Sequence, residues 1–214
     1  AGAFDVGAAC AGFVVGLHTS AAIAQASAGS VLLIASEVRS KFLDKNNFAT
    51  SVLFGDGAAA CLVSQDPEQA EFRFIASALF ADGEVSDTVS TPAGGSRLPA
   101  ALCTNPEQFY ITIKEGTALF VKAVHGMVDS ATGFLNELNL SSTDIQWLVP
   151  HQGNKNLVLA VAKQLGFADE QVIKTVEENG NTSGSSVGIA LDYLREHAGI
   201  KSTDNVLLVA AGGG

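Results

Sequence analysis

The stretch AFDVGAACAGFVVGL, residues 3–17, contains the signals that decide the fold of this chain. A short apolar run at 3–7 predicts a buried strand. The residues after it, 9–28, are apolar on almost every side and predict a buried helix. Between the two stands Cys10, surrounded by alanine and glycine. Small neighbours allow either close backbone packing or access of a substrate to a thiol, so this unit is both a fold signal and a candidate site.

The remainder of the chain alternates strand-like and helix-like segments. The apolar run at 30–38 is continuous rather than alternating, which is typical of a strand in a sheet covered on both faces. Strands that alternate with helices indicate an α/β fold with a mostly parallel sheet. The pattern predicts strands at 30–38, within 51–64, and at 72–82, 146–149, 172–176 and 205–211, and helices at 115–138, 154–165 and 184–197.

Composition limits the possible partners and environment. The formal net charge is −10, so no basic field favours nucleic acid. The apolar stretches are interrupted by His18, Gln25 and Ser27, and we expect no membrane span and no signal peptide. An odd number of widely spaced cysteines without metal-ligand spacing favours a cytoplasmic protein with free thiols and no metal. These cysteines are Cys10, Cys61 and Cys103.

Three polar residues follow predicted strands at the carboxyl end, where α/β folds collect their reactive groups. Cys10 follows the first strand, and His151 and Asn181 follow two later ones. A thiol, an imidazole and a carboxamide form a coherent set for acyl chemistry. Cys10 would stand in the first turn of its helix, where backbone N–H groups and the helix dipole favour the thiolate and lower the pKa of the thiol.

Each of these residues also has a plainer interpretation. Cys10 alone could equally be a buried structural cysteine. His151 alone is better explained as a surface histidine at a helix start, and Asn181 as a turn or cap residue. The glycine turn at 55–57 resembles a phosphate loop only loosely and lacks a lysine, so it predicts a tight turn. The remaining cysteines and histidines are expected to be structural: Cys61, Cys103, His18, His125 and His197.

Taken together, the three turns resemble one enzyme family. DVGAACAGF (5–13), VPHQGNKNL (149–157) and GNTSGSSVGIAL (180–191) are similar to the active-site segments of β-ketoacyl-acyl-carrier-protein synthase III, in the thiolase superfamily. LFGDGAAACLVS and AAGGG also match this family. The resemblance runs along the whole chain, but the first portion of the family's N-terminal half and its last strand are absent.

The resemblance implies a thiolase-like layered α-β-α-β-α fold with mostly parallel mixed sheets and buried helices between them. Residues 1–92 would be the rest of the N-terminal half, which carries the nucleophile. Residues 93–214 would be the C-terminal half, which carries the histidine and the asparagine. In the family, the strand that matches 30–38 pairs with its twin across a two-fold axis, which implies a homodimer. The alternative is that 30–38 is an internal strand of a monomer.

The resemblance also implies a role for each site residue. Cys10 would be the acylated nucleophile, and His151 and Asn181 would drive decarboxylation. The backbone N–H groups of Cys10 and Gly213 would form the oxyanion hole, and Gly153 and Asn154 would bind substrate near the pantetheine. A carrier-protein patch is expected from three lysines: Lys122, Lys155 and Lys163. The chain departs from the family at Ala211, where phenylalanine is common, and at Asn156, where arginine is frequent.

The function implied is a decarboxylative Claisen condensation that starts fatty acid synthesis. An acyl-CoA primer would be loaded on the cysteine and joined to malonyl-acyl-carrier protein. Coenzyme A thioesters and phosphopantetheine-linked substrates suffice for this reaction, without any metal or redox cofactor. Two alternatives remain open. One is a synthase III-like acyltransferase or polyketide starter enzyme, and the other is a non-catalytic partner or structural fragment.

Overall fold

The computed structural model describes residues 2–68, 70–84 and 88–213. Its main helices are α1 (Gly12–Ser27), α3 (Gly116–Glu137), α4 (Lys155–Leu165) and α6 (Ser186–His197). Two short helices are α2 (Phe48–Ser51) and α5 (Val176–Asn179). The strands are β1 (Val31–Glu37), β2 (Gly57–Val63), β3 (Val89–Ser90), β4 (Thr112–Ile113), β5 (Trp147–Pro150) and β6 (Val206–Val209). Three 3₁₀ turns matter below: η1 (Ala9–Ala11), η2 (Arg39–Phe42) and η7 (Ser183–Ser185).

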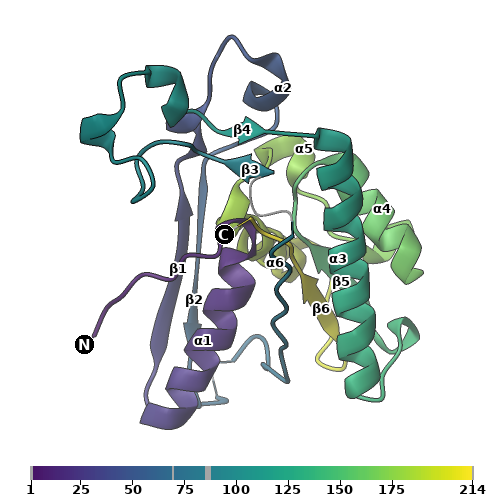
Figure 1. The fold of residues 1–214 in the computed structure, drawn as a ribbon. Coiled ribbons are helices and arrows are strands. Elements are labelled where there is room, and N and C mark those ends of the chain that lie inside the picture. The colour runs from purple at the N-terminus through teal and green to yellow at the C-terminus, as the bar shows by residue number, and fades with distance from the viewer. Residues whose placement is uncertain (1, 69, 85–87, 214) are drawn as a thin grey trace.

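The parallel pair β5–β6 lies between two helical layers (Figure 1). Successive side chains of a strand point to opposite faces, and β5 uses both faces for the core. Leu148 packs in a cluster with α3 and α4, whereas Val149 packs in a second cluster with α1 and α6. The second cluster continues onto the inner face of β1 and β2 through Leu33 and Ala59. The layers therefore follow the order α3/α4, β5/β6, α1/α6, β1/β2.

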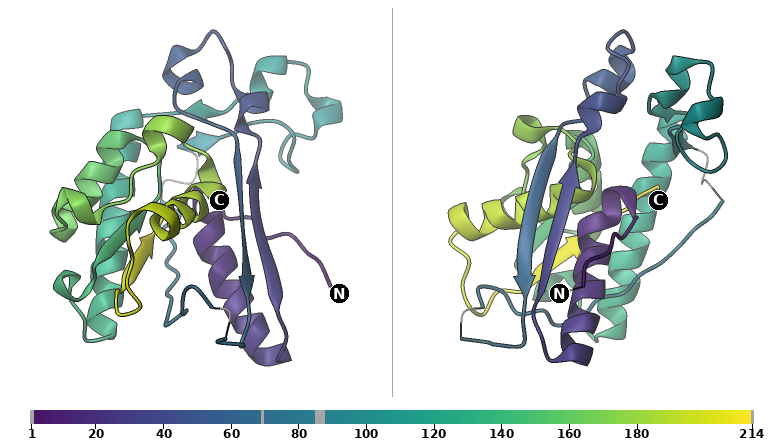
Figure 2. Two further views of the ribbon diagram at one scale, coloured as in Figure 1. Left: turned by 180° about the vertical axis from the view of Figure 1, so that it is seen from behind. Right: turned by 90° about the vertical axis from the view of Figure 1, so that its left-hand side faces the viewer.

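The outer face of the β1–β2 pair is uncovered in the described chain. Leu32, Ile34 and Leu62 are 61%, 60% and 68% exposed, and they alternate with inward-facing neighbours. In the right-hand view of Figure 2 no helix lies over this face. The layered order agrees with the expected α-β-α-β-α arrangement as far as its fourth layer. The expectation that 30–38 is covered on both faces is wrong for this chain.

The described chain contains both parallel and antiparallel strand pairs, each in its own two-stranded sheet, so the expected mostly parallel pairing holds only in part. β5 pairs with β6 in parallel, and an isolated parallel bridge joins Leu148 to Val172. By contrast, β1–β2 and β3–β4 are antiparallel. In β1–β2, Val31 pairs with Val63 and Glu37 pairs with Gly57, so the two strands are in register along their whole length.

Three predicted strands are absent or reduced. Residues 2–7 are exposed and contain no strand, so the expected buried strand at 3–7 is wrong, and Figure 1 shows this segment running away from the body. Residues 72–82 form no strand either. The predicted strand at 172–176 is reduced to a single bridge at Val172. Strands require a partner edge, and none is available to these segments over more than one residue of the described chain.

The four predicted helices are confirmed, and local signals explain their bounds. α4 begins where the Asn154 side chain accepts a hydrogen bond from the Leu157 N–H, and it ends at Gly166 in the left-handed region at φ +80°. One helical stretch, Ala9–Ser27, is long and apolar enough to cross a membrane by length and composition alone. The interruptions at His18, Gln25 and Ser27 therefore do not exclude a span by themselves, and the expectation of no membrane span stays a prediction. In this fold Phe13 and Gly16 of that helix are buried against the body.

Candidate active site

The turn at 181–186 is the centre of the site, and a glycine turn from the other half of the chain fixes it. The Asn181 N–H donates to the Leu53 carbonyl at 2.8 Å, and the Gly55 N–H donates to the Asn181 carbonyl at 3.1 Å. A Cβ on Gly55 would lie 2.0 Å from the carbonyl oxygen of Asn179. Only glycine allows this approach. The turn at 55–57, predicted merely to be tight, therefore holds the candidate asparagine in place.

The side-chain amide of Asn181 is oriented by its own turn. Its Oδ1 accepts a hydrogen bond from the Ser183 N–H at 2.8 Å, and the residue is only 8% exposed. Nδ2 makes no hydrogen bond to the described residues. The turn thus uses the acceptor of the amide and leaves its donor available to a ligand.

His151 is buried at the end of β5, so its interpretation as a surface histidine is wrong. The residue is 5% exposed, and its Nδ1 lies 2.8 Å from Ser186 Oγ. The Gln152 N–H donates to the same Oγ at 3.4 Å, which leaves the Ser186 hydroxyl hydrogen able to point to Nδ1. In that arrangement Nδ1 accepts, and the ring proton is on Nε2. Burial lowers the pKa of His151 to about 4. At neutral pH the ring is therefore an uncharged Nε2–H donor.

Gln152 was not singled out from the sequence, yet it ties His151 to the neighbouring segment. Its Nε2 donates to the carbonyls of Pro150 at 2.7 Å and Ile173 at 3.1 Å, and its Oε1 accepts from the Thr175 N–H at 2.9 Å. The side chain is 1% exposed. A buried amide with donor and acceptor both used rigidifies its surroundings. The only sequence signal was an amide directly after the Pro-His pair.

Cys10 lies in η1, which leads directly into α1. Its Sγ contacts Ser183 Oγ at 3.5 Å, so the thiol meets the same turn that holds Asn181. Ala9 and Ser183 on either side of this contact have φ +42° and +53°. Such left-handed conformations are unfavourable for residues with a Cβ and tend to gather at functional sites.

The resting thiol is less acidic than the sequence predicted. Burial raises the pKa of Cys10, while the hydrogen bond with Ser183 and the nearby charge of Arg39 act in the opposite direction. The expectation that the helix start lowers this pKa is therefore wrong for the resting chain. Burial also raises the pKa of Cys61, a partly buried residue of β2 that packs against the second core cluster, as expected for a structural cysteine.

The C-terminal glycine run passes against the cysteine turn. A Cβ on Gly212 would lie 3.0 Å from the Cys10 nitrogen and 2.7 Å from the Ala11 nitrogen. A Cβ on Gly213 would meet only Val89, with its carbonyl oxygen 3.8 Å away. The run thus lies beside the candidate nucleophile, while the assignment of Gly213 to an oxyanion hole stays a prediction.

The two predicted substrate-binding residues lie next to His151. A Cβ on Gly153 would come within 3.3 Å of His151 Nε2, so a side chain there would crowd the available donor. Asn154 uses its Oδ1 to cap α4. Its plain structural role is therefore evident, and its contact with substrate stays a prediction.

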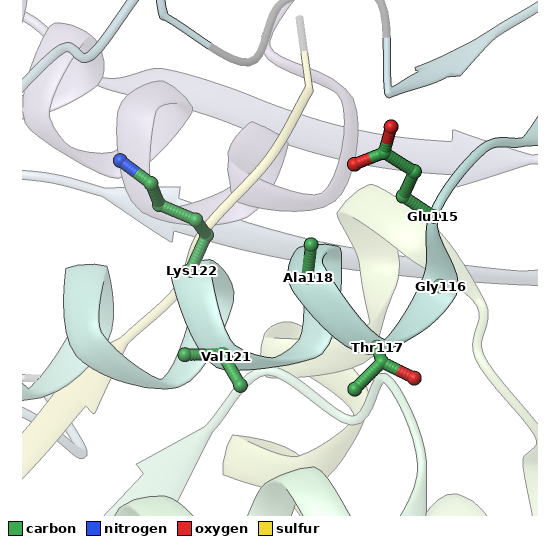
Figure 3. A pocket seen from close by; sticks show the side chains of 6 residues that line it. All are labelled: Glu115, Gly116, Thr117, Ala118, Val121 and Lys122. Carbon is green, nitrogen blue, oxygen red and sulfur yellow. The ribbon is translucent and has the colours of Figure 1, made fainter.

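The predicted lysine patch is largely occupied by acidic partners. Lys122 pairs with Glu84 at 3.3 Å and with Asp82 at 3.6 Å, and Lys155 pairs with Glu177 at 2.8 Å. Lys163 lies exposed on α4. An open pocket of about 620 Å³ lies at the start of α3. Figure 3 shows the residues that line this pocket: Glu115 and Lys122 lie on one side of the first turns of α3, and Val121 lies on the other.

Comparison with family models places the chain in one family. Residues 4–83 match the model described as 3-oxoacyl-[acyl-carrier-protein] synthase III, and residues 135–214 match the model of the C-terminal part of the same enzyme. The division of the chain at residues 92 and 93 lies between these matches and stays a prediction.

Curated relatives support the same assignment. The β-ketoacyl-[acyl-carrier-protein] synthase III of Chlamydia caviae is 43% identical over 214 residues, which is 99% of this chain and 63% of the relative. The enzyme of the same name from Clostridioides difficile is 37% identical, covering 99% of this chain and 64% of the relative. The chain thus spans less than two thirds of the length of the curated relatives it matches.

Solved structures confirm the thiolase-like layered fold. The synthase III of Pseudomonas aeruginosa superposes with a TM-score of 0.83 at 32% identity, over 96% of this chain and 61% of that chain. The Aquifex aeolicus enzyme gives 0.84 at 28%, over 98% and 63%. A priming β-ketosynthase from the R1128 polyketide biosynthetic pathway also gives 0.84 at 28%, over 99% and 62%. The sequence, the fold and these matches agree, and the chain belongs to the 3-oxoacyl-(β-ketoacyl-)acyl-carrier-protein synthase III family.

Proposed function

We propose that this chain is the part of a β-ketoacyl-acyl-carrier-protein synthase III that carries the catalytic residues. The reaction would join an acyl-CoA primer to malonyl-acyl-carrier protein with loss of CO2, the first condensation of fatty acid synthesis. One observation carries the proposal. Two uncharged donors lie at the turn 181–186: Asn181 begins the turn, and His151 contacts its last residue, Ser186, while the Cys10 thiol contacts Ser183 between them.

In the first stage Cys10 is the nucleophile. Its thiolate attacks the thioester carbon of acyl-CoA, and the bond from that carbon to the coenzyme A sulfur breaks. Coenzyme A leaves as a thiolate and takes up a proton. The tetrahedral oxyanion would accept hydrogen bonds from the backbone N–H groups of Cys10 and Gly213. Gly212 lies against the Cys10 nitrogen, which supports a location of this glycine run beside the reacting carbon.

In the second stage the histidine and asparagine stabilise charge. When the malonyl carbon–carboxylate bond breaks, its electron pair forms an enolate on the thioester. The enolate oxygen would accept hydrogen bonds from His151 Nε2–H and Asn181 Nδ2–H. A donor of this kind contributes about 10²–10³ in rate. The enolate carbon then attacks the acyl group, and the Cys10 sulfur departs as thiolate. We propose that no metal or redox cofactor takes part.

Mass spectrometry after incubation with acetyl-CoA tests this assignment. We expect an acetyl adduct on Cys10 and none in Cys10→Ala, with Cys61→Ala as the matched control that keeps the adduct. His151→Ala and Asn181→Ala should retain acylation while malonyl decarboxylation falls by about 10²-fold or more. An adduct found only on Cys61 or Cys103 would overturn the proposal.

We also propose that the carrier protein binds near Lys122, Lys155 and Lys163. An acidic carrier protein would have to displace Glu177 from Lys155 and the two acidic residues from Lys122. Lys155→Glu combined with Lys163→Glu should raise the KM for malonyl-carrier protein, most strongly at low salt. An unchanged KM would exclude this patch.

We further propose a cytoplasmic homodimer in which β1 strands of two chains pair antiparallel. β1 pairs with β2 along one edge, and no strand of the described chain pairs with its other edge. An open strand edge that is also apolar invites association. The alternative is a monomer with an internal strand at 30–38. Sedimentation at micromolar concentration separates the two, since a well-behaved monomer would exclude the dimer.

A starter enzyme of polyketide synthesis is the second candidate. The likeness to a priming β-ketosynthase, as close in TM-score as that to the Aquifex aeolicus enzyme, favours it. Both candidates use the same three residues, so primer choice distinguishes them. Condensation with acetyl-CoA alone would favour fatty acid initiation, whereas a preference for other primers would favour the starter enzyme.

A further inference from the structure

A series of hydrogen-bonded polar side chains ends at the Cys10 sulfur. Arg39 Nη2 pairs with Glu37 Oε2 at 2.8 Å, and the same Nη2 donates to Ser183 Oγ at 2.8 Å. Ser183 Oγ in turn lies 3.5 Å from Cys10 Sγ. Glu37 closes β1, Arg39 opens η2 and Ser183 opens η7. The reaction described above gives none of these three side chains a role.

The donor and acceptor properties of these side chains fix the direction of each hydrogen bond in the series. A guanidinium can only donate hydrogen bonds, so Ser183 Oγ must accept from Arg39. The hydroxyl hydrogen of Ser183 is then free. While Cys10 is a thiol, its hydrogen can point to Ser183 Oγ. Once the sulfur is a thiolate, the Ser183 hydrogen can turn to it and supply a hydrogen bond to a charged group.

Glu37 and its neighbours hold the arginine in place. Its Oε1 accepts from the Gly184 N–H at 3.1 Å while Oε2 pairs with Arg39. A Cβ on Gly184 would lie 2.7 Å from that Oε1 and 2.9 Å from the Ala9 carbonyl oxygen, so glycine is required there. Arg39 Nε is buried without an acceptor in the part of the chain that is described. An unmatched buried donor costs stability, so stability alone does not account for this arginine.

We propose that Arg39 is a positioning residue for Cys10, which acts through Ser183 to keep a hydrogen-bond donor directed at the sulfur as the thiolate forms. The inference rests on the proposed function, in which Cys10 is the nucleophile. The charges that act on the thiol agree with it. Arg39 lowers the pKa of Cys10 and Glu37 raises it, while His151 is uncharged at neutral pH.

The pH dependence of Cys10 alkylation tests the proposal without any acyl substrate. Iodoacetamide labelling from about pH 6 to pH 10, resolved by peptide mass spectrometry, reports the thiolate at each cysteine. In Arg39→Met we expect Cys10 to react about tenfold more slowly at neutral pH, as for loss of a hydrogen bond to a charged group, with its midpoint moved to higher pH. Arg39→Lys should restore part of the rate. Arg73→Met, an exposed arginine, is the matched control and should change nothing.

A double-mutant cycle shows whether the effect passes through the serine. Ser183→Ala should slow Cys10 as Arg39→Met does, and Arg39→Met added to Ser183→Ala should change little. Cys61 and Cys103 serve as internal controls, with unchanged rates in every variant. If Arg39→Met does not fold by circular dichroism, Ser183→Ala, which removes only a hydroxyl, decides the question alone.

An unchanged Cys10 pH profile in Ser183→Ala, or fully additive effects in the cycle, would overturn the proposal. A chain with the expected alkylation profiles but no acetyl adduct would instead overturn the proposed function.

Discussion

The two best-formed sheets of this molecule contrast in how they are covered. β5 is enclosed on both faces, with Leu148 and Val149 both at 0% exposure. β1 is an equally apolar strand, yet Leu32 and Ile34 on its outer face are 61% and 60% exposed. The difference shows that an apolar run in the sequence indicates which strand faces are favoured for burial. It does not indicate which faces are buried in the structure.

The contrast extends to the candidate site. His151 follows the enclosed strand and is held by buried hydrogen bonds. Cys10 precedes α1, which packs on the half-covered β1–β2 pair. The donor side of the site thus has a more complete core beneath it than the nucleophile side. Stability measurements can break or sharpen this comparison.

The largest difference in the free energy of unfolding is expected when a leucine side chain is truncated to alanine on β5 and on β1. Leu148→Ala should lower the free energy of unfolding by about 2–5 kcal/mol, because it leaves a cavity in an enclosed core. Leu32→Ala, the matched control on the open face, should change it by less than about 0.5 kcal/mol. Urea unfolding followed by circular dichroism measures both. Equal losses would mean that the outer face is buried in solution.

Acidification should destabilise the enclosed side through His151. Burial lowers the pKa of His151 to about 4 from 6.5, so below pH 6.5 the unfolded chain binds a proton that the folded chain does not. Stability is therefore lost as the pH falls from about 6.5 to about 4, by about 2–3 kcal/mol at pH 4.5. The measurement compares urea unfolding at pH 7 and pH 4.5 in the wild type and in His151→Gln. A variant with the same loss as the wild type would contradict this.

The start of α4 offers a smaller test on the enclosed side. Asn154→Ala removes the side chain that accepts from the Leu157 N–H, which should cost about 1 kcal/mol. Asn156, exposed in the first turn of the same helix, is the control, and Asn156→Ala should be nearly neutral. The N-cap residue of α1, Ala11, makes no side-chain capping hydrogen bond, so α1 has no equivalent position. Thermal unfolding of both variants would decide, and equal midpoints would argue against the cap.

Charges on the open face should have the smallest effect on stability. Leu32→Lys, Ile34→Lys and Leu62→Lys together should shift the free energy of unfolding by no more than about 0.5 kcal/mol, because these side chains already face water. Binding of a hydrophobic dye should fall clearly. The control is Leu33→Lys, which points inward against Gly16 and should unfold the chain. A large loss of stability in the triple variant would show that the face is covered.

Local signals predicted the helices well, because caps and breakers act within a few residues. Asn154 and Gly166 bound α4 for reasons visible in the sequence. The strands were harder. The apolar runs at 3–7 and 72–82 have the composition of strands, but a strand exists only where another edge is available, and the sequence does not name that edge.

The same limit applies to the site. The residue types and the turns of Cys10, His151 and Asn181 could be predicted, because reactive groups gather after strands. The contacts that hold them could not, because they join distant segments. Gln152 reaches Thr175, and Arg39 reaches Ser183. Nothing within a few residues of either signals its partner.

The docking of Gly55 on Asn181 also has a consequence for the folding pathway. The two backbone hydrogen bonds that set this asparagine come from residues far away in the sequence, so loop closure must precede them. Contacts of high sequence separation form slowly compared with helices. We expect refolding to recover helical circular dichroism before the asparagine amide reaches its final orientation. Regain of the proposed enolate stabilisation would then report late tertiary assembly, and the proposed catalytic activity would be the last property to return.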